Sequence, residues 1–435
     1  MLNSSGRLRR EIGFFGAAFL ALNAMIGAGI FALPGKVAVN AGLLSHWLFL
    51  VVGVLLLTVV LTFAELASYY KQTGGPVLYA TDAFGPFVGF STGWALFLAR
   101  TTSFAANANV LATYLGSLSD VFAGELAHGV IITVVTIGLT YANVTGVRDG
   151  IRTMGIFTVL KVTPLLLLLL LGLQHVTGAT LIPGAPFLIN ELGDTTLLLI
   201  YAYVGFESIA ITAGETSQPR RTLPRALVAT VLGTGVLYFL IVLVFVSVIQ
   251  PQDYDQATLV DVGRAIAGPV GALGITLAAV FSIGGNLAGS ILAAPRLLFS
   301  MAEKRMLPAW LAHIHPKYST PDRSIILMAS MALVLALSGS FVQLAIASSV
   351  VRLLSYIVSI ASLPAVRRKA DEETRRNAYR LKGGYAIPVI GLAICCWLLL
   401  QSKSESWQVV SILLALGGVM YALEKWFGSR KQKTI

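Results

Sequence analysis

The chain has 435 residues, of which 56% are hydrophobic and only 12% are charged. Soluble globular proteins carry about 25% charged residues, so this composition predicts a polytopic membrane protein and excludes a chain built from water-soluble domains. The formal net charge of +11 could attract a nucleic acid, but the basic residues gather in short loops between apolar segments, which argues against that partner.

Twelve apolar segments follow one another along the chain. A helix needs about 20 apolar residues to cross the hydrocarbon core of a bilayer. By that measure we predict membrane spans at 13–34, 42–67, 84–115, 126–145, 154–173, 189–212, 225–250, 264–302, 324–340, 342–366, 386–401 and 406–427. The connections between spans are short, so we expect one transmembrane domain over residues 1–435, with its function inside the bilayer.

The distribution of lysine and arginine predicts the orientation of these spans. Cytoplasmic loops of membrane proteins carry an excess of Lys and Arg. With the N-terminus inside, 24 of the 31 basic residues fall in cytoplasmic segments, and only Lys36, Arg264 and Lys403 fall in the opposite ones. We therefore expect a multi-pass protein of the cytoplasmic (inner) membrane with both termini in the cytoplasm.

The first predicted span contains the stretch NAMIGAGIFALP, from Asn23 to Pro34. Gly27, Gly29 and Pro34 all weaken a helix at a depth where no water can bind the freed backbone groups. Irregular backbone is tolerated at that depth only where protein buries it or a cavity adjoins it. The stretch therefore predicts an interrupted helix beside a binding site.

Five ionisable side chains fall at bilayer depth in later spans, where such groups are costly and indicate function: Lys161, Glu207, Arg100, Arg352 and Arg296. For Arg296, near the cytoplasmic end of its span, an anchor at the membrane interface is the favoured role. Lys161, in the fifth span, either extends to the cytoplasmic interface or binds the interrupted first span. Arg100 in the third span and Arg352 in the tenth lie near the midplane by residue count. One of these arginines could pair with Glu207, and the other could meet an anionic group of a substrate.

A second weak point lies in the sixth span, in the stretch YAYVGFES from Tyr201 to Ser208, where Gly205 precedes Glu207. The first and sixth spans hold matching places in two five-helix halves, 13–173 and 189–366, with two additional helices in 386–427. Interrupted helices at matching places indicate the substrate site of an inverted-repeat transporter. Their free N–H ends favour a carboxylate and their free C=O ends favour an ammonium group, so together they suit a zwitterion.

Four motifs carry a resemblance to a known family. They are GAGIF at Gly27–Phe31, YAYVGFE at Tyr201–Glu207, GETSQPRRTLPRA at Gly214–Ala226 and RLLFSMAEKRMLPAWLAHIHPKYSTP at Arg296–Pro321. In this order they resemble the amino acid–polyamine–organocation superfamily. The resemblance implies an all-α, LeuT-like 5+5 inverted repeat with 12 transmembrane helices, of which helices 1 and 6 are discontinuous.

The resemblance also implies a set of substrate-binding residues. Backbone amides of the first span would bind the substrate carboxylate, carbonyls of both interrupted spans would bind its ammonium group, and one of two tyrosines would form an aromatic gate. The set is Met25, Ile26, Ala28, Gly29, Ile30, Tyr201, Tyr203, Val204 and Gly205, with Tyr201 or Tyr203 as the gate.

We also predict a set of residues for coupling and gating, of which the resemblance implies Lys161 and Ser282, whereas the buried charges alone single out the others. In some relatives a lysine of the fifth helix takes the place of a coupling cation, and Lys161 fits that pattern, with Ser282 beside it. Glu207 would organise the second interruption through hydrogen bonds, or it would bind substrate or a proton. The full set is Lys161, Glu207, Ser282, Arg100 and Arg352.

These features predict a secondary active transporter rather than an enzyme. We expect proton-coupled symport of small or apolar L-amino acids by alternating access. The alternatives are a sodium-independent exchanger or exporter, including one for acidic amino acids or amines, and, in a different class, a membrane channel. The five histidines show no metal-ligand pattern, and neither a catalytic nor a nucleotide-binding motif occurs, so we expect no cofactor and no metal.

Overall fold

The computed structural model describes residues 13–70, 74–122, 124–146, 150–181, 192–211 and 216–432. The regular elements in these ranges are all helices. The main ones are α1 Phe14–Met25, α2 Gly29–Ala41, α3 Ser45–Tyr69, α4 Pro76–Phe84, α5 Pro86–Gly116, α6 Glu125–Thr145, α7 Gly150–Gly172, α8 Gly178–Leu181, α9 Leu192–Tyr203, α10 Glu207–Ile211, α11 Pro219–Val248, α12 Leu259–Glu303, α13 Asp322–Ser338, α14 Phe341–Lys369, α15 Glu372–Asn377, α16 Ala386–Leu400 and α17 Ser404–Gln432.

The long helices follow the predicted apolar segments to within a few residues at most ends. The largest differences are at the end of α2, which continues to Ala41 and not to residue 34, and at the start of α11, which begins at Pro219 and not at residue 225. Helix α12 also begins early, at Leu259, because Thr258 and Asp261 form a reciprocal capping box there. Its backbone leaves helical geometry at Ala267 and Gly268, just before Pro269. The prediction also missed α4 and α15, which are too short to span a bilayer. Residues 189–191 and 212 of the predicted sixth span lie outside the described residues.

Seven helical stretches in the described ranges are long and apolar enough to cross a membrane, and α1 and α16 are shorter apolar helices. Helix α5 is long enough but less apolar, because its buried face carries Thr101, Thr102 and Asn107. Exposed apolar side chains cover the outer faces of α6 and α17, including Leu126 and Ile412. An apolar exterior around a partly polar interior is what a multi-pass membrane protein requires.

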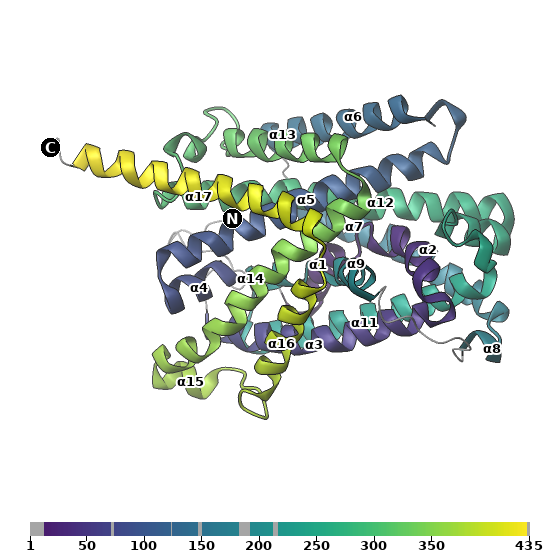
Figure 1. Cartoon of the computed structure of the whole chain (residues 1–435), viewed down its shortest axis with the longest axis horizontal. Coiled ribbons are helices and arrows are strands. Elements are labelled where there is room, and N and C mark those ends of the chain that lie inside the picture. The colour runs from purple at the N-terminus through teal and green to yellow at the C-terminus, as the bar shows by residue number, and fades with distance from the viewer. Residues whose placement is uncertain are drawn as a thin grey trace.

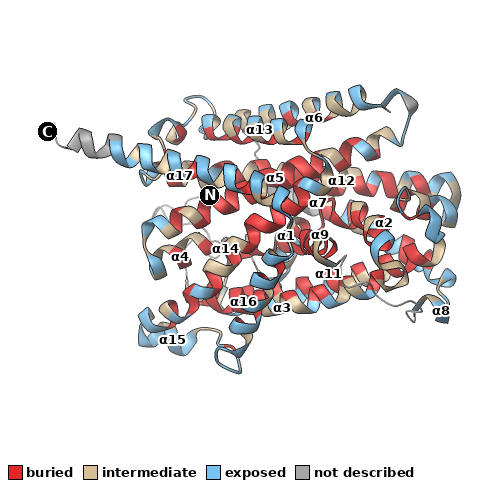
Figure 2. Cartoon of the chain, in the orientation of Figure 1, coloured by how far each residue is buried: buried red, intermediate tan, exposed pale blue. Residues whose placement is uncertain are grey.

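The helices form an elongated bundle in which α4 and α15 lie at one end and α8 lies at the other (Figure 1). Buried residues gather in the middle of the bundle along α1, α5, α9 and α14, whereas α6, α15 and α17 present exposed faces (Figure 2). Helix α3 packs along α11, and α5 packs along both α12 and α14. These long helices surround the two places where the chain breaks its helical path, between α1 and α2 and between α9 and α10.

The two interruptions lie against each other. The helical path stops after Met25 and resumes at Gly29, and it stops again after Tyr203 and resumes at Glu207. Gly205 has a φ of +114°, and a β-carbon added there would lie 2.5 Å from the carbonyl oxygen of Ala24. One added at Gly29 would lie 2.9 Å from the α-carbon of Ala202. Glycine at both places therefore allows direct backbone contact between the first and second interruptions.

Candidate functional site

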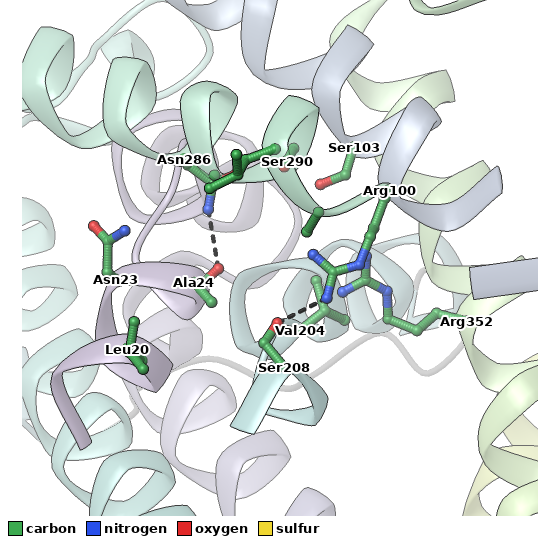
Figure 3. A pocket seen from close by; sticks show the side chains of 14 residues that line it. Leu20, Asn23, Ala24, Arg100, Ser103, Val204, Ser208, Asn286, Ser290 and Arg352 are labelled. Atoms are coloured by element: carbon green, nitrogen blue, oxygen red, sulfur yellow. Dashed lines mark hydrogen bonds between the residues drawn. The ribbon is translucent and has the colours of Figure 1, made fainter. Parts of the chain in front are cut away.

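A cavity of about 210 Å³ adjoins both interruptions. Its wall includes the end of α1, the residues after α9, and facing stretches of α5, α12 and α14. Figure 3 shows the guanidinium groups of Arg100 and Arg352 extending from one side of the cavity toward Ser208 and Val204, with Asn286 and Ala24 on the other side. The cavity therefore has polar groups from five separate helical segments.

Two side chains hold the carbonyl groups that the first interruption frees. Lys161 Nζ of α7 donates to the Ile26 carbonyl at 2.8 Å, and also to the Asn23 side chain at 2.9 Å and carbonyl at 3.3 Å. Ser282 of α12 donates to the same Ile26 carbonyl at 2.9 Å and to that of Gly27 at 3.1 Å. Lys161 is fully buried, so it binds the interrupted helix in this structure instead of extending to the interface.

An asparagine pair bridges the two ends of the first interruption. The Asn107 side-chain oxygen accepts from the Ala28 amide at 3.3 Å and from the Tyr201 hydroxyl at 2.8 Å. The Asn107 side-chain nitrogen donates to Asn286 at 2.7 Å, and Asn286 in turn donates to the Ala24 carbonyl at 3.0 Å. One polar chain across α5 and α12 therefore reaches the last turn of α1 and the first turn of α2.

The first turn of α2 keeps free donors beneath this pair. The amides of Gly29 and Ile30 have no hydrogen-bond acceptor among the described residues. Free amides at a helix N-terminus, aligned with the helix dipole, favour an anion. The Asn107 side-chain oxygen accepts the hydrogen bond of the Ala28 amide, which is one of the amides that the sequence assigns to the substrate carboxylate.

Glu207 closes the second interruption. One carboxylate oxygen accepts from Arg352 at 3.0 Å, and the other accepts from the Tyr356 hydroxyl at 2.9 Å and the Gly205 amide at 3.0 Å. The side chain of Glu207 is completely buried. A buried carboxylate requires such partners, and here they also bind the irregular backbone to α14. Of the two arginines considered as its partner, Arg352 forms the ion pair.

Eight of the nine predicted substrate-binding residues and all five coupling residues fall into three groups, and the ninth, Tyr203, lies apart from them. Val204 and Gly205 line the cavity, together with Arg100 and Arg352 from the coupling set. A second group lies beneath the wall and reaches it through the hydrogen bonds described above: Ile26, Ala28, Tyr201, Lys161, Ser282 and Glu207. The third group, Met25, Gly29 and Ile30, is buried and outside the described lining.

The two candidate gate tyrosines point in different directions. Tyr203 donates its hydroxyl hydrogen to the Phe49 carbonyl at 2.7 Å, and its ring meets that of Tyr238 edge-on at 5.4 Å. Its side chain is therefore fixed between α3 and α11, away from the cavity lining. Tyr201 instead contacts the asparagine pair, and its ring meets Phe341 at 5.8 Å.

Several polar residues of the wall were not among the predicted site residues. Asn286 and Ser290 follow Ser282 at intervals of four residues on α12, and Ser103 follows Arg100 on α5. Residues three or four apart share one face of a helix. A search for polar side chains at that spacing within apolar spans could have found them. Ser208 carries no such signal, because α10 is only one short turn.

The described residues contain no group of three or more His, Cys, Asp or Glu side chains that could hold a metal ion. The polar groups of the site are instead amides, carbonyls, hydroxyls and guanidinium groups. Such groups can bind a charged organic molecule by hydrogen bonds, and nothing in their arrangement provides a nucleophile paired with a base.

Comparison with known proteins gives one consistent answer. The family model described as "Amino acid permease" matches residues 12–418. The chain is 28% identical to the serine/threonine exchanger SteT of Bacillus subtilis, covering 98% of each chain. It is 26% identical to the branched-chain amino acid permease BcaP of the same organism, covering 96% of this chain and 93% of the relative. It is also 26% identical to the mouse large neutral amino acids transporter small subunit 2, over 94% of this chain and 79% of that one.

These relatives are transporters and not enzymes. The match covers nearly the whole chain, and it includes both interruptions and every residue that lines the cavity. The chain therefore belongs to the amino acid permease family of multi-pass membrane transporters.

Proposed function

We propose that this protein is a secondary active transporter that carries L-amino acids across the cytoplasmic membrane by alternating access. The paired interruptions carry this proposal, because they place free backbone donors and acceptors together in the middle of an apolar bundle. A zwitterion is the ligand that such a pair of helix ends suits.

In the proposed binding mode, the substrate carboxylate displaces the Asn107 oxygen and binds the amides of Ala28, Gly29 and Ile30. The ammonium group binds carbonyls at the end of α9, at Tyr203 and Val204. The Ile26 carbonyl is a weaker candidate, because Lys161 and Ser282 already use both of its lone pairs.

We further propose the LeuT-like architecture for the whole chain. In it, twelve spans comprise two inverted five-helix halves, 13–173 and 189–366, and two additional helices in 386–427. The agreement between the predicted segments and the observed helices supports this proposal, as does the matching place of the two interruptions. The basic residues support an orientation with both termini in the cytoplasm.

Proton-coupled symport is the proposed mode of transport. Lys161 supports it, because this one buried side chain binds the interrupted helix α1 from the neighbouring α7. Loss of one proton from Lys161 would leave two N–H donors for the three oxygens of Asn23 and Ile26 that it now binds, and would so loosen the end of α1. Exchange is the second candidate, supported by the relative that is named a serine/threonine exchanger.

Small or apolar L-amino acids are the first candidate substrates, and the names of relatives for serine, threonine and branched-chain amino acids agree with them. Acidic amino acids are the second candidate class, favoured by the two arginines in the cavity wall.

Purified full-length protein in proteoliposomes tests this function. We expect an imposed inward proton gradient to drive uptake of labelled amino acids by the wild type and not by Lys161→Ala. The exposed Lys304 supplies a matched control, since Lys304→Ala should keep gradient-driven uptake. Uptake that is equal with and without the gradient would eliminate symport and leave exchange. Absence of both uptake and counterflow for all amino acids would eliminate amino acid transport.

A further inference from the structure

The wall of the cavity carries an unbalanced positive charge. Two guanidinium groups, from Arg100 and Arg352, line it, and none of its described lining residues is acidic. Glu207 lies behind the wall, and its two oxygens already accept from three donors. One carboxylate against two guanidinium groups leaves a formal charge of +1 beside the cavity.

Arg100 holds this unbalanced charge. It donates one hydrogen bond, to the Ser208 hydroxyl at 2.8 Å, and it forms no ion pair with the described residues. A guanidinium group has five N–H donors, so most of its capacity is unused. A cation at bilayer depth is costly, and a neutral side chain could bind a serine hydroxyl equally well. Glu207 attracts both guanidinium groups but can neutralise only one of them, so the remaining positive charge suits an anionic group that enters the cavity.

The position of Arg100 relates this charge to the substrate. Arg100, Ser103 and Asn107 share one face of α5, and Asn107 occupies the Ala28 amide, where the substrate carboxylate is proposed to bind. Seven residues of helix separate Arg100 from Asn107, which is about 10 Å along the axis. A long arginine side chain and an extended amino acid can together span that separation.

We infer that Arg100 binds an anionic group on the substrate's side chain, so that dicarboxylic L-amino acids, the second candidate class above, are bound in preference to the small or apolar ones. This inference rests on the proposed amino acid transport at the same site. The α-carboxylate and ammonium group bind the interrupted helices, and the second carboxylate neutralises Arg100. Arg352 remains paired with Glu207, and this ion pair fixes the part of the cavity wall that lies next to the second carboxylate.

A purely structural role for Arg100 predicts a different result. If Arg100 only fixes α10 through Ser208, its loss should weaken transport of every amino acid by the same factor. If it binds a substrate carboxylate, its loss should weaken only acidic substrates. L-Glutamate and L-glutamine separate these cases, because they have nearly the same shape and differ by one charge.

The test is competition for counterflow in proteoliposomes of the full-length protein. We expect the wild type to be inhibited by L-glutamate at a concentration at least about tenfold lower than by L-glutamine, the factor expected for one charge-assisted hydrogen bond. In Arg100→Gln this ratio should fall to about one while L-glutamine counterflow persists. Arg296→Gln is the matched control, because Arg296 lies on α12 outside the described lining, and its ratio should stay as in the wild type.

A second measurement does not depend on the variants. Ligands that bind the native state raise its melting temperature, so L-glutamate should stabilise the wild type more than L-glutamine at equal concentration. Equal inhibition and equal stabilisation by the two ligands would overturn the inference and leave amino acid transport intact. A preference for L-glutamate that survives in Arg100→Gln would overturn the assignment to Arg100. Absence of counterflow with every amino acid would instead overturn the proposed function.

Discussion

Substitution of Gly205 by alanine tests whether the contact between the two interruptions holds the site together. Gly205 combines a φ of +114° with close contact, because an added β-carbon would lie 2.5 Å from the Ala24 oxygen and 3.2 Å from the Met25 nitrogen. The atoms that block the β-carbon belong to the backbone. They cannot rotate away as a flexible side chain could.

The cost of Gly205→Ala has two parts. Holding a residue other than glycine in a sparsely populated region of φ costs about 1–3 kcal/mol. Forcing an extra carbon into a closely packed place costs a further 1–3 kcal/mol or so, through shifts of neighbouring backbone. We therefore expect the free energy of unfolding to fall by about 2–6 kcal/mol. The shift should also separate α10 from the end of α1 and abolish transport.

The assay compares the melting temperature of the purified protein in detergent with counterflow in proteoliposomes. Gly138→Ala is the control, because Gly138 lies inside α6 and a β-carbon there meets no atom within 4 Å. Alanine within a helix is more stable than glycine by about 0.5–1 kcal/mol, so this control should melt at or above the wild-type temperature. If Gly205→Ala melts and transports like the control, the proposed close contact between the two interruptions is wrong.

Two further predictions concern the polar contacts around the interruptions. Glu207→Gln leaves the buried Arg352 without its charged partner and should lower the free energy of unfolding by about 3–5 kcal/mol, whereas Glu372→Gln, in an exposed ion pair of α15, should change it by less than about 1 kcal/mol. Equal melting temperatures of these two variants would contradict the buried pair. Asn286→Ala removes the donor from the Ala24 carbonyl and should cost about 1–3 kcal/mol, measured as the melting temperature without substrate. An unchanged value would show that the asparagine bridge contributes nothing to stability.

Much of the helical framework could be predicted from the sequence. Hydropathy is a property of consecutive residues, so the apolar segments and most of their ends follow from it directly. Weak backbone is also local, which is why Gly27 and Gly29, and later Gly205, mark the two interruptions before any packing is known. The ionisable residues in apolar spans can also be found from the sequence alone, because their depth in the bilayer is enough to make a charged group energetically costly.

The tertiary structure decided which of these residues meet. Glu207 had two possible arginine partners, and only the rotation of α5 and α14 about their axes brings Arg352 to it and leaves Arg100 bonded to the Ser208 hydroxyl. Rotation likewise directs Tyr203 toward Phe49 and away from the cavity. Such contacts join segments far apart in the chain, and their geometry depends on how all the helices pack together. The sequence by itself therefore determined where the helices run and where they are interrupted, and packing alone decided which side chains face the cavity.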